Sequence, residues 1–153
     1  MRLIGLDVGE VRIGVAVSDP TGTLASAREV LARRPEALAL KAIARLVEEE
    51  EAEAVIVGLP RSLSGELHGQ AALVQEFADK LRKEVQVPVK FWDERLSTVA
   101  AEREMRAAGT KRERRKAMID AVAAAIILQS YLDARRAQGP GSALDETEAS
   151  AEE

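Results

Sequence analysis

Short apolar runs alternate with segments of helical periodicity along most of this chain, and this alternation restricts the fold more than any other feature. Residues 2–8 and 12–19 are two apolar runs joined by a short link, which is typical of a β-hairpin, and a third strand is expected at residues 24–31. The run AVIVG at residues 54–58 is continuously apolar, as in strands that are covered on both faces. We therefore predict an α/β fold, with a mixed sheet flanked by helices.

A stripe of apolar residues at helical spacing predicts the first helix, which begins near Pro35 and ends at the acidic residues 48–51. The members of this stripe are Leu38, Ile43, Leu46 and Val47. Further elements are expected at residues 70–84 (helix), 87–92 (strand), 98–108 (helix) and 118–132 (helix).

The 153 residues suit one domain with a single core. Residues 139–153 hold five acids and no base and have no apolar pattern, so we expect a disordered acidic tail there, after a domain that spans residues 1–138. The sequence has neither an apolar run near twenty residues nor a basic leader followed by an apolar stretch, which predicts a cytoplasmic protein that does not use a membrane.

The formal net charge of −4 is unevenly distributed. Without the tail, 22 basic residues face 21 acidic ones, and residues 103–116 hold seven basic and two acidic residues. This basic segment includes Arg112, Arg114 and Arg115 and is suited to holding a polyanion, with a merely solvated helix surface as the alternative.

The absence of Cys excludes thiol catalysis and Cys-based metal sites, and His68 is the one His, placed in the polar loop of residues 58–69. A divalent cation would therefore be held by oxygen ligands, which makes carboxylates the candidates. A P-loop is excluded because Val15 and Ala16 follow Gly14 where Lys and Ser or Thr are needed.

Three acidic positions interrupt apolar or strand-end contexts. Asp7 lies inside the first apolar run, and Gly9 would let a phosphate approach the backbone there. Asp93 and Glu94 end a predicted strand, where binding sites of open α/β sheets gather. Asp120 has mostly Ala at helical spacings of three and four, and small side chains would let its helix lie close to the sheet, although an ordinary surface acid is the alternative.

Taken together, these acids indicate one site in which carboxylates hold divalent ions beside a phosphodiester. Two Mg²⁺ ions would stabilise the attacking and leaving oxygens of a phosphoryl transfer. The basic segment before Asp120 would hold the polyanionic substrate.

Four motifs occur in order: GLDVGEVRIGVAVSD at residues 5–19, VGLPRSLSG at 57–65, WDERLST at 92–98 and IDAVAAAIILQSYL at 119–132. In this combination the chain resembles the bacterial YqgF family of RNase H-like nucleases, also called RuvX. The resemblance implies an RNase H-like fold with a mixed five-stranded sheet in the order 3-2-1-4-5.

The same resemblance implies a metal-dependent nuclease that processes the 5′ end of pre-16S rRNA during ribosome biogenesis, acting on nucleic acid or on ribosomal precursor particles. Its acidic triad falls on Asp7, Glu94 and Asp120, with Asp93 as an additional candidate ligand, and would hold two Mg²⁺ or Mn²⁺ ions. Residues expected around the scissile phosphate are Arg12, Arg61, Arg95, Ser97 and Thr98.

Alternative functions remain open at this point. A Holliday junction resolvase that acts on branched DNA fits the same residues, because phosphate contacts position a substrate without identifying it. A nucleic-acid-binding ribosome-assembly factor without catalysis is a second alternative. The hairpin also resembles the first phosphate loop of actin-like ATPases and sugar kinases, but these need a second lobe. The sequence does not decide between a monomer and a homodimer.

Overall fold

The computed structural model describes residues 1–60, 70–94 and 112–138, except for the side chains of residues 112–117 and 138. Its strands are β1 (Leu3–Val8), β2 (Arg12–Ser18), β3 (Ala25–Ala32), β4 (Ala54–Leu59) and β5 (Val89–Asp93), and its helices are α1 (Glu36–Glu49), α2 (Gln70–Glu84) and α4 (Arg112–Gln138). The predicted helix at 98–108 and the predicted tail at 139–153 lie outside the described residues.

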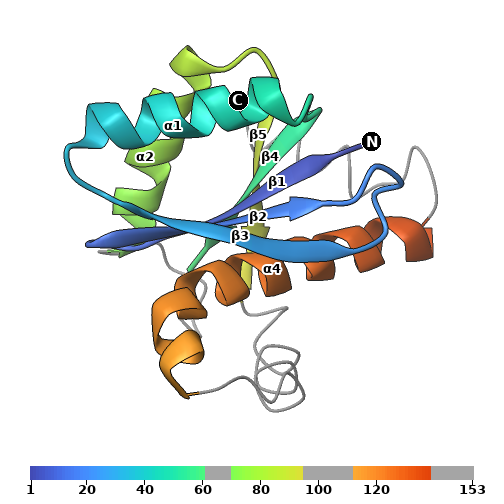
Figure 1. The fold of residues 1–153 in the computed structure, drawn as a ribbon. Coiled ribbons are helices and arrows are strands. Elements are labelled where there is room, and N and C mark those ends of the chain that lie inside the picture. The colour runs from blue at the N-terminus through green and yellow to red at the C-terminus, as the bar shows by residue number, and fades with distance from the viewer. Residues whose placement is uncertain (61–69, 95–111, 139–153) are drawn as a thin grey trace.

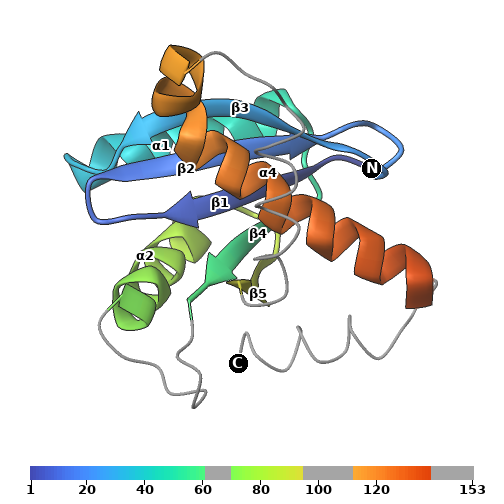
Figure 2. The ribbon, with the colours of Figure 1, turned by 90° about the horizontal axis from the view of Figure 1, so that it is seen from below.

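The five strands form one mixed sheet in the order β3-β2-β1-β4-β5, which confirms the predicted fold. The β1–β2 and β2–β3 pairs are antiparallel, whereas β4 is parallel to both β1 and β5. Helices α1 and α2 cover one face of the sheet, and α4 crosses the other face (Figures 1 and 2). The carboxyl ends of β1, β4 and β5 therefore lie at the same edge of the sheet.

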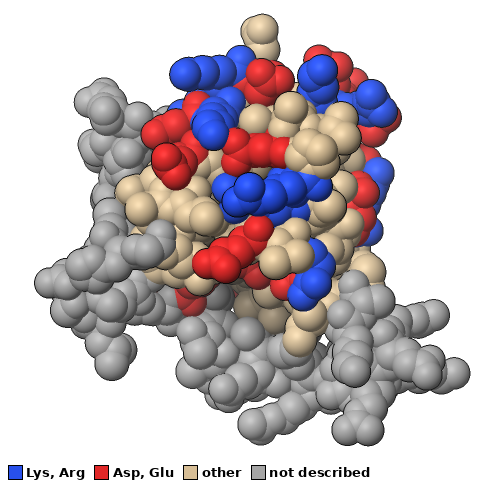
Figure 3. All heavy atoms as spheres, turned by 90° about the vertical axis from the view of Figure 1, so that its left-hand side faces the viewer, with Lys and Arg blue, Asp and Glu red and all other residues tan. Residues whose placement is uncertain are grey.

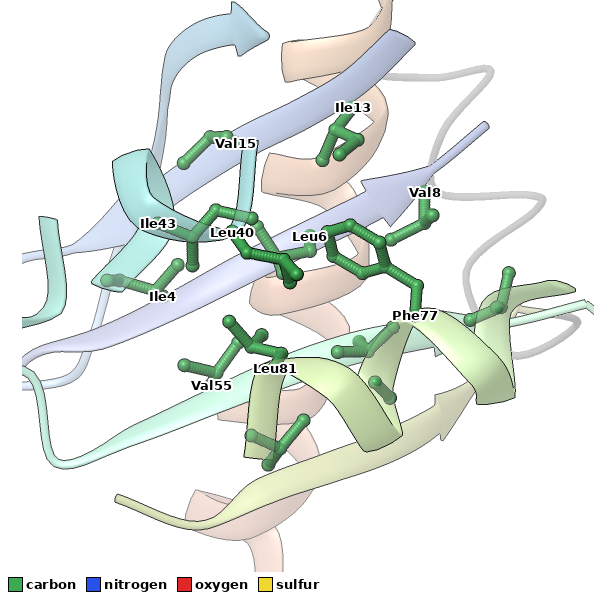
Figure 4. Close-up of a cluster of buried hydrophobic side chains, with 14 of the residues drawn as sticks. Ile4, Leu6, Val8, Ile13, Val15, Leu40, Ile43, Val55, Phe77 and Leu81 are labelled. Atoms are coloured by element: carbon green, nitrogen blue, oxygen red, sulfur yellow. The ribbon is translucent and has the colours of Figure 1, made fainter. Parts of the chain in front are cut away.

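The face under α1 and α2 holds the larger apolar core (Figure 4). Ile4, Leu6 and Val8 alternate along β1 and point into this core, where they meet Ile43 of α1 and Phe77 of α2. This alternation sends the intervening residues of β1, including Asp7, to the opposite face.

One residue of the predicted helical stripe is not in the core: Leu38 is 63% exposed. Its five-residue offset from Ile43 corresponds to roughly 140° around a helix, so the two side chains cannot share a face. The buried residues of α1 are instead Ala39, Leu40, Ile43, Leu46 and Val47.

Glycines on the other face let α4 lie very close to the sheet. A Cβ atom added to Gly5 would come within 2.8 Å of the Leu128 Cβ, and one added to Gly58 within 2.6 Å of the Ile127 Cδ1. A Cβ added to Gly14 would overlap the carbonyl oxygen of Asp120 itself. Three neighbouring strands thus each contribute a position at which only glycine leaves room for the helix.

Polar contacts fix the direction in which α4 crosses the sheet. The Gln129 side chain accepts a hydrogen bond from the Ala25 amide (2.8 Å) and donates one to the Thr23 carbonyl (2.9 Å), and the Trp92 indole donates to the Ser130 hydroxyl (3.0 Å). None of the helices in the described part of the chain is long and apolar enough to cross a membrane.

Candidate active site

Asp7 occupies the next-to-last position of β1, and its Cα pairs with that of Gly14 on β2. Because Leu6 and Val8 point into the core under α1 and α2, the Asp7 side chain points toward α4. Opposite Asp7, the missing side chain of Gly14 lets the backbone of Asp120 lie directly against the strand. A carboxylate is thereby placed at the carboxyl end of a central strand, as the sequence predicted.

Glu94 follows β5 directly, and its side chain lies over Gly58 of β4. A Cβ added to Gly58 would stand 3.0 Å from the Glu94 Oε1, so the missing side chain makes room for this carboxyl group. From there Glu94 forms a side-chain hydrogen bond with Asp7 across β4. Two of the three predicted acids are therefore in direct contact.

Burial and mutual repulsion change the acidity of this pair. Desolvation, followed by the negative charge of Asp7, raises the pKa of Glu94 to about 7. Burial also raises the pKa of Asp7. The hydrogen bond from Glu94 lowers this pKa, and the negative charge of Asp120 raises it further. The hydrogen bond between them lowers the pKa of Asp7 and raises that of Glu94, as expected when Glu94 is the donor and Asp7 the acceptor.

Asp120 of α4 lies beside the pair but is bound by an arginine. The Arg12 Nε donates a hydrogen bond of 2.9 Å to the Asp120 Oδ2. The charge of Asp120 nevertheless acts on Asp7, so the third predicted acid belongs to the same electrostatic environment. Asp93, the additional candidate, ends β5 and acts on Glu94 through its charge.

Within the described residues, no three acidic or His side chains stand together as a group able to hold a metal ion. The donor set nevertheless fits a hard divalent cation, since Asp7, Glu94 and Asp120 offer only carboxylate oxygens. The raised pKa values of Asp7 and Glu94 show that ionising both acids is costly without a positive partner. A bound cation would remove that cost once Asp120 joined the pair.

Arg33 is a feature of this site that sequence reasoning missed. It is 6% exposed, donates hydrogen bonds to the Gly9 carbonyl (3.1 Å) and to Glu36 (3.0 Å), and lies over the Phe77 ring. It thus holds the turn between Asp7 and Arg12, which is closed by a 2.8 Å hydrogen bond from the Gly9 amide to the Arg12 carbonyl. Nothing in the Arg-Arg-Pro sequence distinguishes a buried arginine from a surface one.

Several residues that the sequence singled out lie outside the described part of the chain, namely Arg61, His68, Arg95, Ser97 and Thr98, together with the side chains of Arg112, Arg114 and Arg115.

Figure 3 shows the side of the molecule from which α1 begins, and basic and acidic side chains lie close together across its described part. The described part of this face is therefore of mixed charge.

Comparison with known sequences gives extensive matches. The family model RuvX, described as "Holliday junction resolvase", matches residues 1–134. A protein of Roseiflexus sp. (strain RS-1) named "Putative pre-16S rRNA nuclease" is 50% identical over 135 residues, which cover 88% of this chain and 96% of that protein. A protein of the same name from Halothermothrix orenii is 47% identical over 133 residues, covering 87% and 95% of the two chains.

Solved structures with a similar fold include two proteins in complex with Holliday junctions. The T. thermophilus RuvC in complex with Holliday junction substrate superimposes with a TM-score of 0.60 at 21% identity, covering 91% of this chain and 98% of that one. The fowlpox virus resolvase in complex with Holliday junction DNA gives a TM-score of 0.52 at 11% identity, covering 88% and 98%. At these identities the likeness establishes the RNase H-like fold alone.

Proposed function

The chain belongs to the RuvX family, and from this membership and the geometry of its acids we propose that it is a divalent-metal-dependent nuclease that hydrolyses phosphodiester bonds in nucleic acid. The observation that carries the proposal is the hydrogen-bonded pair of Asp7 and Glu94, with Asp120 beside it, at the carboxyl ends of β1 and β5 on either side of β4. Buried acids that disturb each other's ionisation are typical of catalytic centres.

Asp7, Glu94 and Asp120 would hold Mg²⁺ or Mn²⁺, with Asp93 as an additional ligand. When bound, two such ions would stabilise the charges on the attacking and leaving oxygens of the phosphodiester. In the protein itself, β1 and β5 fix the Asp7 and Glu94 carboxyl groups against each other, Gly58 of β4 makes room for Glu94, and Gly14 of β2 brings the Asp120 backbone against the sheet.

Pre-16S rRNA is the substrate we propose first, because relatives that are 50% and 47% identical over most of this chain carry the name "Putative pre-16S rRNA nuclease". In this role the protein would act on the 5′ end of the precursor, free or in ribosomal precursor particles. Branched DNA is the second candidate, and it is favoured by the description of the family and by the resolvase folds. Arg12, Arg61, Arg95, Ser97 and Thr98 would contact the scissile phosphate in either case.

A side-by-side cleavage assay tests the proposal. The purified protein is incubated with a precursor rRNA segment and with a four-way DNA junction, each in Mg²⁺, in Mn²⁺ and in excess chelator. We expect cleavage of the rRNA segment only when a divalent ion is present.

Asp7→Asn is the inactive variant in this assay, and Asp133→Asn is the matched control, because Asp133 is an ion-paired acid on α4 that lies away from the pair. Cleavage of the junction alone would reassign the substrate to DNA. Tight binding of either substrate without any metal-dependent cleavage would make the protein a binding factor and refute the nuclease proposal.

A further inference from the structure

Arg12 is placed to act on Asp120 specifically. Arg12, Gly14 and Ala16 alternate along β2 on the face covered by α4, and the backbone of Asp120 lies directly against Gly14. Arg12 therefore lies two residues along β2 from Gly14, the residue at which α4 touches the strand. From this position the Arg12 Nε reaches the Asp120 Oδ2 at 2.9 Å, whereas Asp7 and Glu94 are bonded to each other.

This ion pair competes with the role of Asp120 as a ligand. Asp120 is bonded to Arg12, and within the described residues no three acids form a cation-holding group. The two roles compete for this carboxylate, because the guanidinium hydrogen and a cation are both attracted to its lone pairs. Asp120 therefore completes the site more readily when Arg12 releases it.

The ion pair of Arg12 and Asp120 is exposed enough for Arg12 to exchange its partner. The Arg12 side chain is 61% exposed and that of Asp120 is 30% exposed, and solvent-exposed ion pairs alter an equilibrium by no more than about fivefold. A phosphodiester is also an anion, and guanidinium groups bind phosphate oxygens in the same fork geometry that they use for carboxylates. Arg12 can therefore change partners at little cost when such a group arrives at the turn.

We propose that Arg12 is a positioning residue that holds Asp120 out of the cation site until the phosphate of a substrate replaces Asp120 as the partner of the guanidinium. The inference rests on the proposed function, since it needs a cation site built from Asp7, Glu94 and Asp120. Its consequence is reciprocal coupling: the phosphodiester strengthens cation binding, and the cation strengthens phosphodiester binding.

Cation binding without any substrate tests the first half of the inference. The full-length wild-type protein, Arg12→Gln, Asp120→Asn and the double variant are titrated with Mn²⁺ while the free ion is followed by electron paramagnetic resonance. We expect Arg12→Gln to bind Mn²⁺ about two- to fivefold more tightly than the wild type. Arg28→Gln is the matched control, because Arg28 is also an arginine on a strand with one carboxylate partner, Glu50, at 2.7 Å.

The double variant separates the proposed exchange from a general charge effect. If Arg12 acts through Asp120, removing Arg12 has no effect on Mn²⁺ binding once Asp120 is already Asn. An equal gain in affinity in both backgrounds would mean that Arg12 merely repels the cation, and it would overturn the inference. An unchanged affinity of Arg12→Gln would overturn it too.

Dimethyl phosphate, a minimal phosphodiester, tests the second half. Adding it should tighten Mn²⁺ binding by the wild type and have a clearly smaller effect on Arg12→Gln. Equal tightening of both proteins would refute the exchange of partners.

Failure of the underlying nuclease proposal gives a different pattern. In that case the wild type binds no Mn²⁺, or Asp7→Asn binds it as tightly as the wild type. Mn²⁺ binding that depends on Asp7 but not on Arg12 would leave the nuclease proposal intact and remove the inference about Arg12 alone.

Discussion

The backbone of Asp120 rests directly against Gly14, with no side chain between helix α4 and strand β2 at that point. Since Gly14 also pairs with Asp7, this single contact sets how far the acid of the helix stands from the acid of the central strand. The distance between two of the three candidate ligands is therefore determined by a residue that bears no functional group.

Gly14→Ala should destabilise the protein, because the added methyl group would overlap the Asp120 carbonyl and neither backbone can move freely. Overpacking of this kind costs about 3 kcal/mol, which urea denaturation would measure. Ser26→Ala on the exposed strand β3 is the control and should have little effect. A Gly14→Ala variant with wild-type stability would mean that α4 does not lie as close to the sheet as described.

Asp7→Asn, Glu94→Gln and Asp120→Asn should each lower the cleavage rate by more than about 100-fold while leaving the fold intact, because each removes a negative ligand without changing its size. Single-turnover cleavage at saturating Mg²⁺, together with circular dichroism, checks both parts. A wild-type rate for any of the three would remove that residue from the ligand set.

Asp93→Asn should reduce cleavage less than Glu94→Gln does. Asp93 acts on Glu94 through its charge, whereas Glu94 is bonded to Asp7. Rates measured in parallel for the two variants test this ranking, and equal losses would assign Asp93 an equal share in the site.

In excess chelator, the free energy of unfolding should fall as the pH rises from about 5 to about 8. The pKa of Glu94 is raised from its ordinary value of 4.5 to about 7, so the folded state favours its protonated form. The stabilisation is complete below the unfolded pKa and is lost as the pH passes the folded one. The raised pKa of Asp7 acts in the same direction.

Urea denaturation at several pH values measures this dependence. Glu94→Gln should flatten the curve, Glu84→Gln on the exposed end of α2 should leave it unchanged, and Mg²⁺ should restore stability at pH 8. Parallel curves for the wild type and Glu94→Gln would contradict the assignment of the proton to Glu94.

Replacing Arg112, Arg114 and Arg115 with Gln should weaken nucleic-acid binding at low salt and flatten its salt dependence. Removing one ionic interaction with a phosphate lowers the slope of log affinity against log salt by roughly 0.7 to 0.9. The matched control replaces the exposed Lys41, Arg45 and Lys83, which lie on α1 and α2 away from α4. Equal slopes for the wild type and the Arg variant would show that this basic segment is only a solvated surface.

Truncation after Gln138 should leave cleavage unchanged, because residues 139–153 are acidic and lack an apolar pattern, and the family model ends at residue 134. Cleavage rate and thermal midpoint of the truncated chain check this prediction. A large decrease in either would show that the tail contacts the domain.

The sheet and its flanking helices could be predicted because alternation and helical periodicity report burial directly, as they do for β1 and α2. The Asp7 position could be predicted for the same reason, since a carboxylate stands out in an apolar strand. The alanines around Asp120 predicted that α4 could lie close to the sheet, but the glycines that meet it could not be predicted, because they come from three separate strands and meet only in the folded sheet. The partner of Asp120 escaped prediction too, since Arg12 is 108 residues away along the chain.

The division of the sheet into two unlike faces has a consequence for how this sequence can change over time. The face under α1 and α2 contains large apolar side chains such as Phe77 and Leu81, whose volumes can be exchanged among neighbours. The face under α4 also holds large side chains such as Trp92 and Tyr131, but there the glycine and alanine contacts set the position of the acids. Substitutions on the first face can therefore change stability while the acids keep their positions. Because the sheet separates the two faces, most of the substitutions that the protein tolerates leave the candidate site unchanged.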